Sequence, residues 1–304
     1  MKTYRTVISA VLLTAVLLCA CGRKAPETPE TPGAEEPVST VSAQESASVL
    51  CSDGARTLRF SRNDQDGWQW TDDVSFPLDG QYVDQLIAAA RELDGLTPIA
   101  DPKGPEVYGL VGSKSYLTVV GSDGSQVTYS FGNEAEGGYY CNSSADTARI
   151  CVAPERILDL LGRSIYDMAL LPDIPDLSAD SLRSVTITRG DEADQLTLSR
   201  GSWSRAGQDV TGEEQVQKLA AGLETLSVMK CVDYAPAAGA AEVCGLASPA
   251  AVLHLELDKG EFLLRVGGYD QAESAYFVTI GDDTTIYLMG GDVPALLAGW
   301  TIGG

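Results

Sequence analysis

The sequence predicts an α+β protein that contains two repeats, each a mainly antiparallel sheet with one amphipathic helix and a short closing helix. Three observations support this. First, the chain after residue 47 contains an internal duplication. Second, short alternating apolar runs are separated by hairpin signals such as Asp-Gly and Gly-Asp-Asp. Third, each half contains one run with apolar residues at helical spacing. Strands joined by hairpins pair antiparallel, and helices kept apart from them give an α+β architecture.

Residues 1–20 resemble a bacterial lipoprotein signal peptide. Lys2 and Arg5 form a positive start, Val7–Leu18 is an apolar run, and a small residue precedes Cys21. We expect cleavage before Cys21 and a lipid on its thiol. The mature protein would then be anchored on the outer face of the cytoplasmic membrane, or face the periplasm if the host has an outer membrane. The alternative is an ordinary secretory signal with a chance cysteine, or an uncleaved anchor helix. Cys19 departs from the lipoprotein pattern, since a small aliphatic or hydroxyl residue is commoner at its position.

Residues 21–47 are rich in Pro, Glu, Thr, Ser and Ala. Such a composition buries too little apolar surface to offset chain entropy, so we expect a disordered tether. The whole chain has 21 Lys and Arg against 43 Asp and Glu, a formal net charge of −22. A body with this charge repels nucleic acid, which we exclude as a partner.

The duplication defines repeat 1 over residues 48–165 and repeat 2 over 181–304, with a linker at 166–180. Trp70 to Leu93 and Trp203 to Leu226 span the same distance, and the apolar residues between them share one helical spacing. We expect helices near residues 80–94 and 213–227. The run Thr211-Gly212-Glu213-Glu214 predicts a capping box at the start of the second helix.

The similarity continues in the strands that follow. Val107-Tyr108-Gly109-Leu110 matches Val243-Cys244-Gly245-Leu246, and Ile150-Cys151-Val152 matches Ile286-Tyr287-Leu288. This order of Trp, helix, Gly-Leu turn, strands and closing helix resembles the bacterial family called domain of unknown function 4340, present here twice. The resemblance implies an extracytoplasmic, membrane-anchored protein. Some members are associated with gliding-motility-type ABC transport systems, and the family brings no catalytic residues.

No motif in the chain predicts an enzyme. His254 is the only histidine and alternates with Leu253 and Leu255 in a strand, so we interpret it as a structural or surface residue. Asp64-Gln65-Asp66-Gly67 lacks the twelfth-position Glu of a calcium loop and predicts a hairpin turn. We therefore expect no catalytic residues, no metal site and no cofactor.

The aromatic residues give the candidate contact positions. Trp70 and Trp203 occupy equivalent places before the amphipathic helices, which favours core packing. Trp68 has no counterpart in repeat 2 and is the candidate for an exposed contact. Tyr139 and Tyr140 join it as candidate ligand or partner contacts.

Five cysteines follow Cys21. Cys141 and Cys151 lie symmetrically about Asp146, as opposed residues of a hairpin do, and their counterparts Phe277 and Tyr287 are symmetric about Asp282. We predict a Cys141–Cys151 disulfide and a second one between Cys231 and Cys244, with Cys51 free. Buried free thiols are the alternative.

Two function classes remain open. The first is a non-enzymatic binding or accessory lipoprotein that contacts another envelope protein. The second is a small-molecule or glycan-binding module that uses a cleft between the repeats. A surface with an exposed apolar patch favours the first, and aromatics in a deep concavity favour the second.

Overall fold

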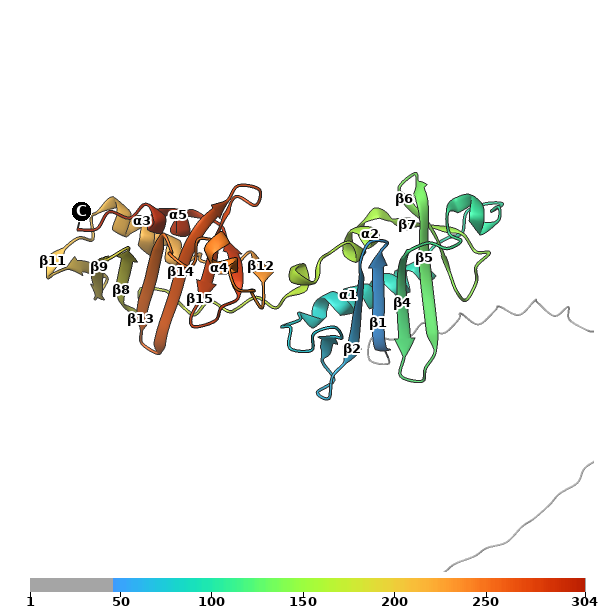
Figure 1. The fold of residues 1–304 in the computed structure, drawn as a ribbon, viewed down its shortest axis with the longest axis horizontal. Helices are drawn as coiled ribbons and strands as arrows, with labels where there is room; N and C mark the ends of the chain where they lie inside the picture. The colour runs from blue at the N-terminus through green and yellow to red at the C-terminus, as the bar shows by residue number, and fades with distance from the viewer. Residues whose placement is uncertain (1–45, 304) are drawn as a thin grey trace, which may run out of the picture. The chain divides into compact units, whose positions relative to one another are not determined.

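The computed structural model describes residues 46–303, and the predicted signal peptide, Cys21 and nearly all of the predicted tether lie outside this range. The described chain contains helices and two antiparallel sheets, which confirms the α+β class (Figure 1). No helix of the described residues is long and apolar enough to cross a bilayer.

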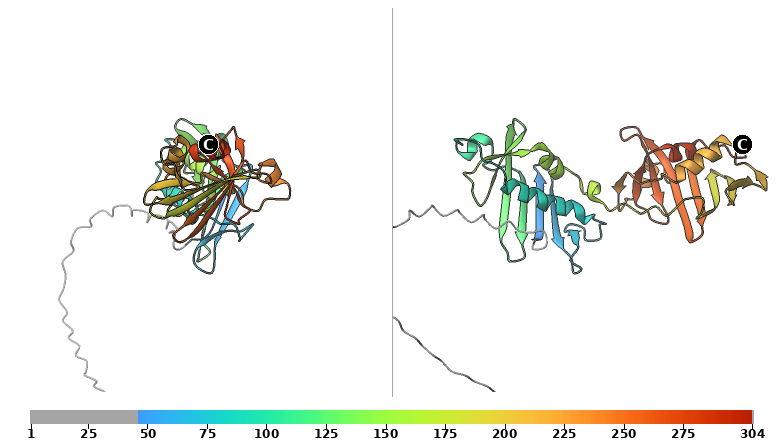
Figure 2. Two further views of the ribbon diagram at one scale, coloured as in Figure 1. Left: turned by 90° about the vertical axis from the view of Figure 1, so that its left-hand side faces the viewer. Right: turned by 180° about the vertical axis from the view of Figure 1, so that it is seen from behind.

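The first sheet has seven strands in the order β3-β2-β1-β4-β5-β6-β7. Their bounds are β1 Ser46–Asp53, β2 Thr57–Arg62, β3 Trp68–Trp70, β4 Ser115–Gly121, β5 Gln126–Ala135, β6 Gly138–Ser143 and β7 Cys151–Pro154. Helix α1 (Gly80–Asp94) crosses one face of this sheet (Figures 1 and 2), and the short helices are η1 (Pro105–Tyr108), α2 (Glu155–Leu161) and η2 (Ile165–Met168).

Helix α1 forms as its spacing predicts. Val83, Leu86, Ala90 and Leu93 are all buried against the sheet, because residues three and four apart share one helix face. The Asp79 side chain caps the helix by accepting a hydrogen bond from the Gln81 N–H.

The second sheet has nine strands in the order β11-β10-β9-β8-β13-β14-β15-β16-β12. Their bounds are β8 Leu182–Arg189, β9 Glu192–Ser199, β10 Ser202–Arg205, β11 Gln208–Asp209, β12 Lys230–Asp233, β13 Ala251–Leu257, β14 Gly260–Asp270, β15 Ala275–Ile280 and β16 Ile286–Met289. The helices of this half are α3 (Glu214–Leu223), α4 (Ala240–Val243) and α5 (Asp292–Ala298), and α5 packs on β13 and β14 beside α3.

Helix α3 differs from its prediction at both ends. The helix stops at Leu223, earlier than predicted, and the predicted capping box does not form. The Thr211 hydroxyl instead accepts a hydrogen bond from the Trp203 N–H at 2.8 Å, and the Glu213 carboxylate pairs with Arg205 at 2.9 Å. Thr211 is therefore bonded to β10, and Glu214, the other side chain of the predicted capping box, pairs with Lys218 at 2.7 Å.

The register of the closing hairpins also departs from the prediction in one half. Cys141 faces Cys151 between β6 and β7, as predicted. Phe277, however, faces Leu288, and Tyr287 faces Val278, so the predicted Phe277–Tyr287 pair is wrong by one residue. The turn after β15 sets this register, and a slip of one residue changes which side chains meet.

The structure contains neither predicted disulfide. Cys51, Cys141, Cys151, Cys231 and Cys244 are all buried free thiols. Burial raises the pKa of Cys141 to about 12, so its thiol stays protonated at neutral pH. The Asp64–Gly67 segment forms the predicted hairpin turn, in which the Asn63 N–H donates to the Gly67 carbonyl at 2.9 Å.

Candidate functional site

Each half contains a tight turn closed by a left-handed glycine, and we call Pro105–Leu110 and Ala241–Leu246 the glycine turns. Gly109 has φ 73° and Gly245 has φ 70°. The glycine N–H donates to the carbonyl three residues back, at 3.4 Å and 3.1 Å, and the following leucine N–H donates five residues back, at 3.1 Å and 2.7 Å. This is the helix-ending arrangement that a left-handed glycine allows.

Each glycine turn lies against a bulged strand of its own sheet. The β5–β6 register shifts between Phe131 and Glu134, and the β14–β15 register shifts between Val266 and Tyr269. In the second half the Gly268 N–H donates to the Cys244 carbonyl at 2.7 Å. The leucines that follow the two glycines, Leu110 and Leu246, are buried, so both turns are fixed to their sheets.

Each glycine turn carries one exposed valine. Val107 and Val243 occupy the same place in the two turns and are 51% and 86% exposed. Each follows an exposed glutamate, Glu106 or Glu242. Isolated exposed apolar residues are ordinary, but an exposed valine at the same position of two matching turns forms a repeated surface feature.

Aromatic pairs lie beside both turns. The Tyr108 and Tyr140 rings are 4.7 Å apart between centroids, and the Tyr269 and Tyr276 rings are 5.0 Å apart. Tyr140, a predicted contact residue, is half-buried in its pair, whereas Tyr139 is half-buried on the other face of β6. The structure thus places Tyr140, but not Tyr139, beside the first glycine turn.

Trp68 is buried, which corrects its predicted exposure. Only 8% of the residue is accessible, and its indole N–H donates to Asp84 at 3.0 Å. The guanidinium carbon of Arg62 lies 3.9 Å from the ring centroid. The predicted core role fits Trp203, which is buried, and Trp70, which is partly buried and packs edge-on against Phe76.

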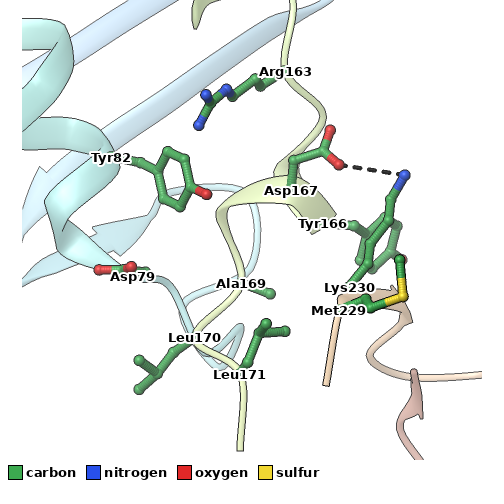
Figure 3. Close-up of a pocket in the computed structure, with 10 residues that line it drawn as sticks. All are labelled: Asp79, Tyr82, Arg163, Tyr166, Asp167, Ala169, Leu170, Leu171, Met229 and Lys230. Carbon is green, nitrogen blue, oxygen red and sulfur yellow. Dashed lines mark ion pairs between the residues drawn. The ribbon is translucent and has the colours of Figure 1, made fainter. Parts of the chain in front are cut away.

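A second candidate site is a pocket of about 550 Å³ lined by residues of both halves (Figure 3). Its lining combines charged, aromatic and apolar side chains: Asp79, Tyr82, Arg163, Tyr166, Asp167, Ala169, Leu170, Leu171, Met229 and Lys230. We call it the junction pocket. It lies where the segment after η2 runs beside the start of α1. Two backbone hydrogen bonds hold these segments together: the Leu170 N–H donates to the Pro77 carbonyl at 2.6 Å, and the Asp79 N–H donates to the Met168 carbonyl at 2.8 Å.

An aromatic cluster adjoins this pocket and joins the two halves. The Phe76 ring packs edge-on against Tyr166 at 5.9 Å and against Tyr234 at 5.5 Å. The Tyr234 hydroxyl donates to the Ser75 carbonyl at 2.8 Å. Edge-to-face contacts of this kind add to the stabilisation by burial.

Two lining residues of the junction pocket, Asp167 and Lys230, form an ion pair. The Lys230 ammonium lies 3.4 Å from Asp167 and 3.3 Å from Glu273. Partial burial acts to raise the pKa of Asp167, but hydrogen bonds from Ser164 and the Lys230 charge lower it overall. Burial acts to lower the pKa of Lys230, and the two carboxylates raise it overall. Both groups are therefore charged at neutral pH.

His254 lies on β13 and its Nε2 is 2.8 Å from the exposed Glu261 carboxylate. Among the described residues, no three His, Cys, Asp or Glu side chains gather in a way that could hold a metal ion. The junction pocket could not be predicted from the sequence, since nothing in the local pattern around Arg163 or Lys230 indicates that they line one pocket.

Comparison with protein families found one match, to the model described as domain of unknown function (DUF4340), over residues 68–249. The match is a single copy that starts at β3 of the first sheet and ends before β13 of the second. No curated protein and no solved structure matched the chain.

Proposed function

The chain belongs to the DUF4340 family, and we propose that it is a lipid-anchored, extracytoplasmic binding or accessory protein, not an enzyme, that docks onto another envelope protein. The lipid on Cys21 would hold the body at the membrane, and the tether would give it reach. The family resemblance suggests a partner in an envelope ABC transport or gliding-motility-like system.

We propose further that the two halves are two copies of one unit. The strand order β3-β2-β1-β4-β5-β6-β7 corresponds to β10-β9-β8-β13-β14-β15-β16, with β11 and β12 added at the edges. The glycine turns support the same proposal, because their hydrogen bonds and their left-handed glycines coincide.

The observation that carries the docking proposal is the exposed valine at the same place in both glycine turns. The turns are fixed by buried leucines and by close packing on the bulged strands. A rigid apolar side chain loses little conformational entropy when a partner covers it, so it suits an interface. The glutamate before each valine adds a charge that selects a partner with basic or polar groups around an apolar hollow.

Charged substitutions of the two valines test this proposal. We would express tagged full-length chain in its own host, cross-link the cells, and quantify co-purified envelope proteins by mass spectrometry. The double variant Val107→Asp/Val243→Asp should lose a specific partner, because a buried unpaired carboxylate is costly. Val74→Asp is the matched control, since Val74 is 66% exposed but lies outside both turns. Retention of every partner by the folded double variant would reject the docking surface.

A second candidate function, a small-molecule or glycan-binding module, is favoured by the junction pocket. Its volume of about 550 Å³ lies within the range of about 300–1,000 Å³ that small-ligand sites occupy. The two candidates use different surfaces, so they can be tested separately.

A further inference from the structure

We propose that the junction pocket binds a small amphiphilic anion, a carboxylate joined to an apolar body, and that Arg163 is the partner of the carboxylate. This inference gives the second candidate function its ligand class. It does not rest on docking through the glycine turns.

Arg163 is the cation that remains available in the pocket. Its guanidinium carbon lies 5.0 Å from the centroid of the Tyr82 ring, and Figure 3 shows the guanidinium pointing toward that ring. No carboxylate among residues 46–303 forms an ion pair with it. A guanidinium has five N–H donors in a planar fork that matches the two oxygens of a carboxylate.

The other charged groups of the pocket already have partners. Asp79 accepts a hydrogen bond from the Gln81 N–H at 3.0 Å as the cap of α1. Asp167 accepts hydrogen bonds from the Ser164 N–H and hydroxyl at 2.9 Å and 2.7 Å, and it pairs with Lys230 (Figure 3). Lys230 also pairs with Glu273. An incoming anion would therefore meet Arg163 as the cation without a carboxylate partner among the described lining residues.

The rest of the lining selects an apolar body. Leu170 is 59% exposed and Met229 is 51% exposed, and they line the pocket together with Leu171 and the rings of Tyr82 and Tyr166. The unbranched thioether side chain of Met229 can adapt to apolar groups of varied shape. Each methylene buried on this lining should strengthen binding by up to about fourfold.

Four probes test the charge and the apolar body. Purified full-length chain would be titrated at constant ionic strength with octanoate, octanamide and acetate, and mixed with phosphatidylglycerol vesicles. Octanoate and octanamide differ in the charge of the head group, and octanoate and acetate differ in the apolar body. The vesicles distinguish a membrane lipid from a free acid as the source of the anion.

Variants locate the site. Arg163→Gln should weaken octanoate binding by about tenfold or more, as expected for the loss of a charge-assisted pair. Leu170→Ala should weaken octanoate but not acetate. Arg200→Gln is the control, because Arg200 is exposed in the β9–β10 turn, away from the pocket lining. Arg163 is exposed as well, so its variant is expected to fold, and circular dichroism checks this.

The result expected is octanoate binding that exceeds octanamide and acetate binding and depends on Arg163 and Leu170. Equal binding of octanoate and octanamide, or octanoate binding that survives Arg163→Gln, would overturn the proposal. Arg163-dependent flotation with vesicles in the absence of octanoate binding would also overturn it, in favour of a membrane-surface contact. None of these outcomes changes with the valine variants, so the two proposals fail independently.

Discussion

The Cα of Gly132 packs so closely on the carbonyl oxygen of Tyr108 that a Cβ at this position would collide with it. Gly267 stands in the same relation to the Cys244 carbonyl. Both contacts fix a glycine turn to a bulged strand, so the surface that carries Val107 or Val243 depends on a glycine more than 20 residues further along the chain.

Replacing these two glycines by alanine should destabilise the protein. Neither Gly132 nor Gly267 has a left-handed φ, so the cost is the collision with a backbone carbonyl, about 1 to 3 kcal/mol per site. Urea unfolding measures it. Gly212→Ala is the matched control, because its Cβ would meet nothing within 4 Å and its φ is not left-handed. If Gly132→Ala left the free energy of unfolding unchanged, the close contact between Gly132 and the Tyr108 carbonyl would not be holding the turn to the sheet.

Asp194 should be important for the stability of the second half. It is 3% exposed and accepts hydrogen bonds from Arg205 Nε at 2.8 Å and from the Trp300 indole N–H at 3.0 Å. Asp194→Ala leaves both donors in a largely buried environment without this acceptor, at a cost of about 3 to 5 kcal/mol. Chemical unfolding measures this loss of stability. Asp191→Ala is the control, because Asp191 lies in an exposed turn. A loss below 1 kcal/mol, the usual effect of a surface pair, would contradict the prediction.

Stability should fall as pH rises above about 9 because of the buried thiols. Burial raises the pKa of Cys51 from 9.0 to about 12, so between these values the unfolded chain loses the proton and the folded chain keeps it. The unfolded state then binds fewer protons, and the unfolding free energy falls by about 1.4 kcal/mol per pH unit for each such thiol. Below pH 9 both states are protonated and this dependence disappears.

The slope of unfolding free energy against pH measures this effect. Cys51→Ala should reduce the slope between pH 9 and 11, while its value at pH 7 reports packing alone. Identical slopes in Cys51→Ala and the parent chain would mean that the thiol titrates alike in both states.

Cys21→Ser should abolish lipid attachment. A lipobox cysteine is the acylated residue, so this variant should incorporate no fatty-acid analogue and should leave the membrane fraction. Cys19→Ser is the control and should be labelled normally. Full labelling of Cys21→Ser would disprove the predicted anchor.

The sequence predicts the helices and strands well because their signals are local. The apolar spacing of Val83 and Leu86 defines α1, and the turn chemistry around Asp146 places Cys141 opposite Cys151. The predictions failed where distant groups compete for one side chain. Thr211 bonds to β10 and Glu214 pairs with Lys218, so these two side chains do not form the capping box.

The candidate sites were predicted only in part for the same reason. The match between Val107 and Val243 is visible in the sequence, but their exposure depends on how the turns pack. Trp68 lacks a counterpart in the other half, yet Arg62 and Asp84 cover it. The junction pocket combines Tyr82, Arg163 and Lys230, and no spacing rule relates residues so far apart.

Site-specific photocross-linking in living cells would show whether Val107 and Val243 contact another envelope protein. A photoreactive amino acid would replace Val107, Val243 or, as control, Val74. We expect one discrete cross-linked protein, identified by mass spectrometry, from positions 107 and 243 and none from position 74. Equal yields of the same adducts from all three positions, or no adduct from either turn in membrane-anchored protein, would contradict it.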